Sequence, residues 1–192
     1  SEEKIEEFEK KLINKEYEVL EKLIEKLNKN ELEHPAIKII YASSKSIKPN
    51  SSIKEKYIAF NLFLEVYEKN LNFKQALYNA CSLCFEIGVY DEILVLLEKF
   101  VKINKYDKKI YQAISKIYLT LGKIDLAIKY LKIIINEEPE NLKAYSSFLF
   151  SLLYSENYSQ EDYMKYALDF SKKVKIFKEV EKKPLIIKSN KK

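Results

Sequence analysis

This chain of 192 residues is 47% hydrophobic and 33% charged, which is typical of a globular protein and excludes a disordered one. No apolar run approaches the roughly 18 residues that cross a bilayer, and the acidic first residues do not resemble a signal peptide. The net charge of +5 includes no arginine, and its positive excess is concentrated in residues 172–192. We therefore expect neither a membrane nor a nucleic acid as partner.

Residues 1–33 form the acidic end of the chain, with 7 lysines against 11 glutamates. Apolar residues recur along one side of an amphipathic pattern, at Ile5, Phe8, Leu12, Leu20, Leu23, Ile24 and Leu27. One long helix over residues 2–28 and a helical hairpin with a break near Asn14–Lys15 both fit this pattern. We favour the hairpin, because residues 14–27 are similar to the second helix of a repeat.

Residues 34–73 are predicted to be a degenerate repeat. Its two helices are expected near residues 35–46 and 52–69. Pro35 suits the first turn of a helix, where its missing N–H group costs nothing. Ser52 and Glu55 have the spacing of a capping box, which opens the second helix after a loop.

Two similar units of 34 residues follow, 74–107 and 108–141. The only glycines of the chain, Gly88 and Gly122, occupy equivalent positions in these units. Their apolar positions also coincide, which indicates stacked helical repeats. Helices are predicted near 73–87, 91–103, 108–121 and 124–136. Each glycine is expected to have a positive φ and to end the first helix of its pair.

Residues 142–175 are predicted to be a terminal repeat whose turn lacks glycine. Asn141 is placed to cap its first helix. The spacing Ser159-x-x-Asp162 starts the second helix, which we expect to end near Val174. Residues 176–192 are predicted to be a basic tail or linker without helix.

The second 34-residue unit carries the clearest motif of the chain. It reads Tyr111-x2-Ile114-Ser115-x2-Tyr118, then Gly122, Ala127-x3-Leu131 and Pro139. This motif resembles the tetratricopeptide repeat (TPR), in which aromatic, small, glycine and proline positions recur with a period of 34. The resemblance implies an all-α fold, namely a right-handed superhelical stack of about five helical hairpins (a TPR-like α-solenoid). It also implies a protein-interaction module rather than an enzyme.

In such a stack, the stripe of each first helix that faces away from its partner lines a concave groove. The predicted groove residues are Gln75, Tyr78, Asn79, Ser82, Phe85, Lys109, Gln112, Lys116, Lys143, Ser147 and Phe150. Amides, hydroxyls, lysines and exposed aromatics suit an extended peptide or protein segment, and the lysines modestly favour an acidic one. The alternative is a solvated helix face without a ligand. Self-association is also compatible with such a module.

No catalytic residue, cofactor or metal site is predicted. Cys81 and Cys84 lie in the middle of a helix, and the only histidine, His34, is far away in sequence. We therefore expect the two cysteines to be reduced, buried packing residues, and His34 to have a structural role. A chain without a disulfide framework is expected in the cytoplasm.

A second resemblance covers about fifty residues at the end of the chain. Residues 144–164 are similar to the last repeat of bacterial proteins like O-linked N-acetylglucosamine transferase. The run that begins Lys183-Pro184-Leu185 is similar to the linker that follows in that family. This resemblance implies an alternative function, as the substrate-recruiting arm of a glycosyltransferase whose catalytic domain follows residue 192.

Overall fold

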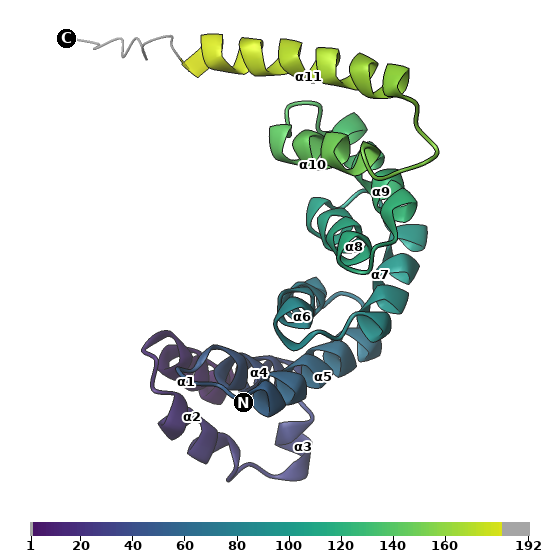
Figure 1. The fold of residues 1–192 in the computed structure, drawn as a ribbon. Helices are drawn as coiled ribbons and strands as arrows, with labels where there is room; N and C mark the ends of the chain where they lie inside the picture. Colours follow the sequence, from purple (N-terminus) through teal and green to yellow (C-terminus); the bar gives the residue numbers. More distant parts are fainter. Residues whose placement is uncertain (1, 182–192) are drawn as a thin grey trace, which may run out of the picture. The chain divides into compact units, whose positions relative to one another are not determined.

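The computed structural model describes the backbone of residues 2–181 and the side chains of residues 2–175, and this part of the chain consists of eleven α-helices without a strand (Figure 1). It divides into two compact units, residues 1–97 and 98–192. The first unit contains α1 (Glu2–Ile13), α2 (Tyr17–Ile24), α3 (Lys29–Leu32), α4 (Pro35–Ile47), α5 (Ile53–Lys69) and α6 (Lys74–Ile87). The division falls within α7 (Asp91–Ile103). The second unit contains α8 (Lys108–Thr120), α9 (Ile124–Glu137), α10 (Leu142–Leu152) and α11 (Gln160–Glu181).

The first two helices form a hairpin that packs on α4. The chain breaks at Lys15, whose φ of 62° is incompatible with a continuous helix over residues 2–28. Apolar residues of all three helices then share one core, which contains Phe8, Leu20, Ile24, Ile37 and Ile40. The short α3 was not expected from the sequence. Its signal is the capping box of Asn28 and Glu31, which satisfies N–H groups at the start of even a single turn.

Successive antiparallel packing of α4, α5 and α6 builds the rest of the first unit. The predicted capping box opens α5, where the Ser52 hydroxyl accepts from the Glu55 N–H and the Glu55 carboxylate accepts from the Ser52 N–H. A buried lysine, Lys38, joins α4 to α5. Its Nζ lies 2.8 Å from the Glu33 carboxylate and 2.6 Å from the Glu65 carboxylate. These lysine contacts satisfy a charge that would otherwise be costly to bury.

Both glycines have the predicted left-handed conformation, with φ of 74° at Gly88 and 69° at Gly122. The Gly88 N–H donates to the Cys84 carbonyl at 2.9 Å and so closes the last turn of α6. The prediction that these residues end the first helix of each hairpin is confirmed.

Replacing Gly122 with valine is expected to lower the free energy of unfolding by about 1 kcal/mol or more. A Cβ at this position would meet no heavy atom within 4 Å, so the cost comes from the positive φ and not from a clash. Urea unfolding followed by circular dichroism measures the change. Gly122→Asn is the control, because asparagine tolerates the left-handed region and should lose less. Unfolding curves that coincide for valine, asparagine and glycine would contradict this account of the turn.

The second unit repeats one capping device at an interval of 34 residues. The Asp107 side chain accepts from the Ile110 N–H at the start of α8, and the Asn141 side chain accepts from the Ala144 N–H at the start of α10. Helices α8, α9, α10 and α11 then pack in sequence. One core of this unit contains Ile128, Leu131, Ile134, Ile135, Ala144, Tyr145, Phe148, Leu149 and Leu152. The first turns of α8 and α10 are therefore capped in the same way.

The last helix is longer than expected from the sequence. α11 continues to Glu181, whereas the sequence suggested an end near Val174 and no helix beyond Ile176. The expectation was wrong because residues 160–183 contain neither glycine nor proline, so nothing local stops a helix once it has started. The rest of the predicted tail, residues 182–192, lies outside the described residues. Among the helices described, none combines the length and apolar character needed to cross a membrane.

Candidate functional site

A hollow of about 260 Å³ lies between α8 and α10, with α9 beneath it. Its lining consists of Gln112, Ser115, Lys116, Leu119, Leu131, Ile134, Lys143, Ala144 and Ser147. Four of these are predicted groove residues from two different repeats: Gln112, Lys116, Lys143 and Ser147. The structure therefore brings together side chains that are separated by up to 35 positions in the sequence.

Helical spacing explains why these side chains share one face. On α8, Gln112 and Lys116 are four residues apart, so they project on the same side of the helix. The other side of α8 is buried through Ile110, Ile114 and Ile117, which fixes the rotation of the helix. The lower wall is apolar because Leu131 and Ile134 of α9 belong to the core. The result is a hollow with an apolar floor and a polar rim.

Two further predicted residues continue this face without lining the hollow. Lys109 is exposed on the first turn of α8. Phe150 is 60% exposed near the end of α10, and its ring centroid lies 5.1 Å from that of Tyr154. Because residues 143, 147 and 150 are spaced by three or four, the lysine, the serine and Phe150 follow one side of α10. Tyr154 lies two residues after the helix ends and contacts Phe150.

The remaining predicted residues lie on α6 in the first unit. Gln75 and Ser82 are exposed, whereas Tyr78, Asn79 and Phe85 are half-buried. The Gln75 amide donates to the Asn79 side chain at 2.8 Å, and the Phe85 ring lies 5.8 Å from the Tyr90 ring. Phe85 was expected to be an exposed aromatic, but part of its ring packs within its own hairpin.

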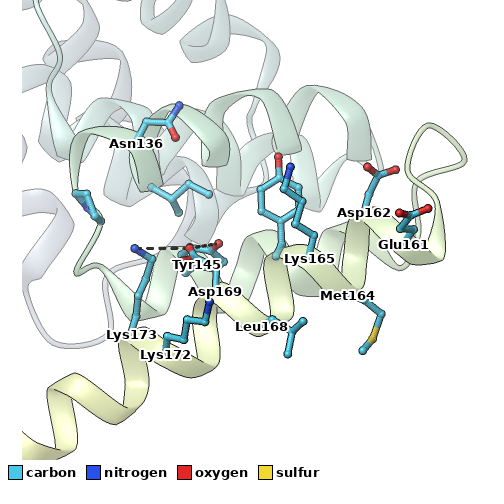
Figure 2. A pocket seen from close by; sticks show the side chains of 13 residues that line it. Asn136, Tyr145, Glu161, Asp162, Met164, Lys165, Leu168, Asp169, Lys172 and Lys173 are labelled. Carbon is cyan, nitrogen blue, oxygen red and sulfur yellow. Dashed lines mark hydrogen bonds and ion pairs between the residues drawn. The ribbon is translucent and has the colours of Figure 1, made fainter.

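A larger cleft, of about 1000 Å³, was not expected from the sequence. It lies between the end of α9, α10 and the long α11, and Figure 2 shows the side chains that line it. The buried Tyr145 donates from Oη to the Asp169 carboxylate at 2.9 Å, and Lys173 Nζ lies 3.6 Å from the same carboxylate. Burial, together with Asp169, raises the pKa of the Tyr145 hydroxyl above its usual range.

Charges of both signs alternate along this cleft. Asp162, Lys165, Asp169 and Lys172 all lie on the α11 side of its wall. Tyr145 of α10 packs against Phe170 of α11, with 5.4 Å between the ring centroids. This contact holds α11 against α10. The cleft thus has a mixed electrostatic character, in contrast to the hollow between α8 and α10.

The two cysteines are buried in α6, as predicted. The Cys84 thiol donates to the Cys81 carbonyl at 3.1 Å, which places the S–H group along its own helix. His34 is exposed and precedes the first turn of α4 without a side-chain capping bond. Within the described residues, no group of three or more His, Cys, Asp or Glu side chains is arranged to hold a metal ion.

Comparisons with known proteins identify the fold. No family model and no curated protein matches this chain. Similar solved structures are "MamA RS-1 ArsTM double mutant" (TM-score 0.68, 16% identity, 90% of this chain and 92% of that chain) and "MamA 41-end from Desulfovibrio magneticus RS-1" (TM-score 0.66, 16% identity, 90% and 92%). A third is "MamA MSR-1 C2" (TM-score 0.64, 12% identity, 91% and 95%).

These similarities, together with the all-helical hairpins, show that the chain has a TPR-like α-solenoid fold. At 12–16% identity they concern the fold alone. The resemblance to O-linked N-acetylglucosamine transferase-like proteins receives no support from them.

Proposed function

We propose that this chain is a protein-interaction module that binds an extended peptide segment of a partner protein in the hollow between α8 and α10. The observation that carries the proposal is the combination of an apolar floor and a polar rim in one concave site. Leu131 and Ile134 supply the floor, and Gln112, Lys116 and Ser147 supply the rim. Ligand sites are usually of this kind, with apolar walls that bind and a few polar groups that orient.

The dimensions of the site indicate how a partner would use it. A volume of about 260 Å³ accommodates a side chain or two, not a folded surface. A partner would therefore insert a side chain into the hollow while its backbone follows the exposed rim. The Ser115 hydroxyl already donates to the Gln112 carbonyl at 3.0 Å, and the Gln112 amide at the rim can contact a peptide backbone.

Filling the hollow tests this function. A library of random 12-residue peptides displayed on phage is selected against the wild-type chain, and enriched peptides are measured by fluorescence anisotropy. Ser147→Trp places a large side chain at the rim and is expected to abolish binding of the enriched peptides, because their inserted side chain loses its space.

The matched control is Ser171→Trp, which makes the same change at an exposed position of α11 outside both lined cavities. This variant should bind as the wild type does. Circular dichroism checks that both variants are folded. A library that yields no binding peptide, or peptides that bind Ser147→Trp and the wild type equally, would refute the proposed function.

A further inference from the structure

We propose that the segment bound by the α8–α10 hollow is acidic and carries an aromatic residue about three positions from its acidic residue. This inference rests on the proposed function and adds the chemistry of the ligand. Two independent features of the surface carry it: the sign of the charges on α8 and α10, and the exposed aromatic pair at the end of α10.

Helices α8 and α10, which flank the hollow, carry no carboxylate. From Lys108 to Ile124 and from Asn141 to Ser155, the ionisable groups other than tyrosine are all lysines. The neighbouring helices differ: α9 carries Asp125 and Glu137, and α11 carries Glu161, Asp162 and Asp169. The hollow is therefore positive, although the second unit as a whole contains many acidic residues.

Glu138, a carboxylate on the loop before α10, is engaged elsewhere. Glu138 lies 2.7 Å from Lys108 Nζ and accepts from Tyr106 Oη at 3.0 Å and from the Asn141 amide at 2.9 Å. The hydrogen bond from Lys108 is the main reason why the pKa of Glu138 lies below its usual value. By contrast, Lys143 makes no ion pair with another described residue. Its ammonium at the rim is thus available to a carboxylate of a ligand.

The aromatic residues at the end of α10 are exposed. Phe150, Leu153 and Tyr154 are each about 60% exposed, although large apolar side chains of this kind normally gather in a core. An apolar surface of several adjacent side chains commonly marks a site of interaction. Because the Phe150 and Tyr154 rings are already in contact, they present one apolar surface to an incoming aromatic ring.

Helix geometry sets the spacing that the ligand must have. Lys143 and Phe150 are seven residues apart on α10, which is about 10 Å along the helix axis. An extended peptide covers about 10 Å in three residues. A segment that runs along α10 therefore reaches both features when its acidic and aromatic residues are about three positions apart.

Other anions are disfavoured by the charges beside the aromatic pair. A second hollow, of about 440 Å³, brings Tyr154 together with Asp125 and Glu156. The Asp125 pKa is lowered mainly by the hydrogen bond from the Ser155 hydroxyl, so this group is ionised at neutral pH. A continuous polyanion such as a nucleic acid or an anionic membrane surface would meet these carboxylates. A peptide whose acidic residue lies only at the Lys143 end would not.

The experiment uses the peptides enriched on the wild-type chain. They are expected to pair Asp or Glu with Phe, Tyr or Trp at a spacing of about three residues. The double variant Lys116→Glu/Lys143→Glu should weaken their binding about tenfold or more and flatten its dependence on salt. Phe150→Ala/Tyr154→Ala should also weaken it, without changing the salt dependence.

The control variant is Lys129→Glu/Lys132→Glu on α9, which changes the net charge equally at positions that do not line the hollow. Its affinity should remain within about twofold of wild type. If the enriched peptides are neutral or basic and Ser147→Trp still abolishes their binding, this inference is overturned and the proposed function stands. Acidic peptides that bind equally to both lysine variants would also overturn it.

Two further measurements distinguish an acidic peptide of a partner protein from other ligands that carry negative charge. Double-stranded DNA and vesicles of phosphatidylcholine with 20% phosphatidylserine should not bind, and binding of either that depends on Lys116 and Lys143 would overturn the assignment to a peptide. Light scattering after size-exclusion chromatography tests whether the bound segment comes from a second copy of the chain. If the chain forms a dimer that the Lys116→Glu/Lys143→Glu variant does not form, the acidic segment belongs to a neighbouring copy. The proposal of a separate partner is then overturned.

Discussion

Phe148→Ala is expected to lower the free energy of unfolding of the second unit by about 3–5 kcal/mol. The Phe148 side chain is fully buried in the core of α9, α10 and α11. Its ring meets Tyr166 of α11 edge to face at 4.9 Å and Tyr145 at 6.1 Å. Truncation removes these contacts and leaves a cavity that the helices cannot close without moving apart. Urea unfolding followed by circular dichroism measures the loss.

The same helix offers a matched control two residues later. Phe150→Ala makes an identical chemical change at a side chain that is 60% exposed, so its effect should stay within about 0.5 kcal/mol. The comparison separates a core position from an exposed position on α10, at which we propose binding. If both variants lose similar stability, the assignment of Phe148 to the core and of Phe150 to the exposed face is wrong.

Lys38→Ala is expected to cost about 2–3 kcal/mol in the first unit. The lysine is only 8% exposed and bridges Glu33 with Glu65 of α5, and Lys69 completes the cluster. Removing it leaves the two carboxylates facing each other with one ammonium instead of two, and it also removes the packing of the lysine stem. Lys38→Met is the control, because it restores the packing but not the charge. Equal stability of the methionine variant and the wild type would show that the charges contribute nothing.

The same cluster predicts a dependence on pH with a defined sign. Hydrogen bonds from Lys38 and Lys69 lower the pKa of Glu33 to about 2, and they also lower that of Glu65. A carboxylate with a depressed pKa in the folded state stabilises the fold above its unfolded pKa, and this contribution is lost as the pH falls from about 4.5 towards 2. Stability measured at pH 7 and pH 3 should therefore change less in Lys38→Met than in the wild type. A wild-type stability that rises on acidification would contradict this sign.

The helix boundaries of this protein were predictable because their signals are local. A positive φ is easily reached only by glycine, so Gly88 and Gly122 marked two turns before any contact was known. Ser52 and Asn141 marked helix starts in the same way, through oxygens that satisfy N–H groups three residues ahead. The recurrence of apolar positions every 34 residues then indicated which helices form pairs. The end of α11 escaped this reasoning because no residue before Pro184 interrupts a helix.

The candidate site could be predicted only in part from these sequence patterns. Helical spacing determined that Gln112 and Lys116 share one face of α8, and that Lys143 and Ser147 share one face of α10. That these four side chains surround a single hollow depends on the distance between the two helices, which the packing of α9 beneath them decides. The half-burial of Phe85 and the cleft beside α11 likewise depend on contacts between helices. The sequence by itself thus determined the helices and their faces, because dihedral preferences and periodicity act within one segment. The tertiary structure alone decided which faces enclose space, because that depends on how closely side chains from separate segments pack.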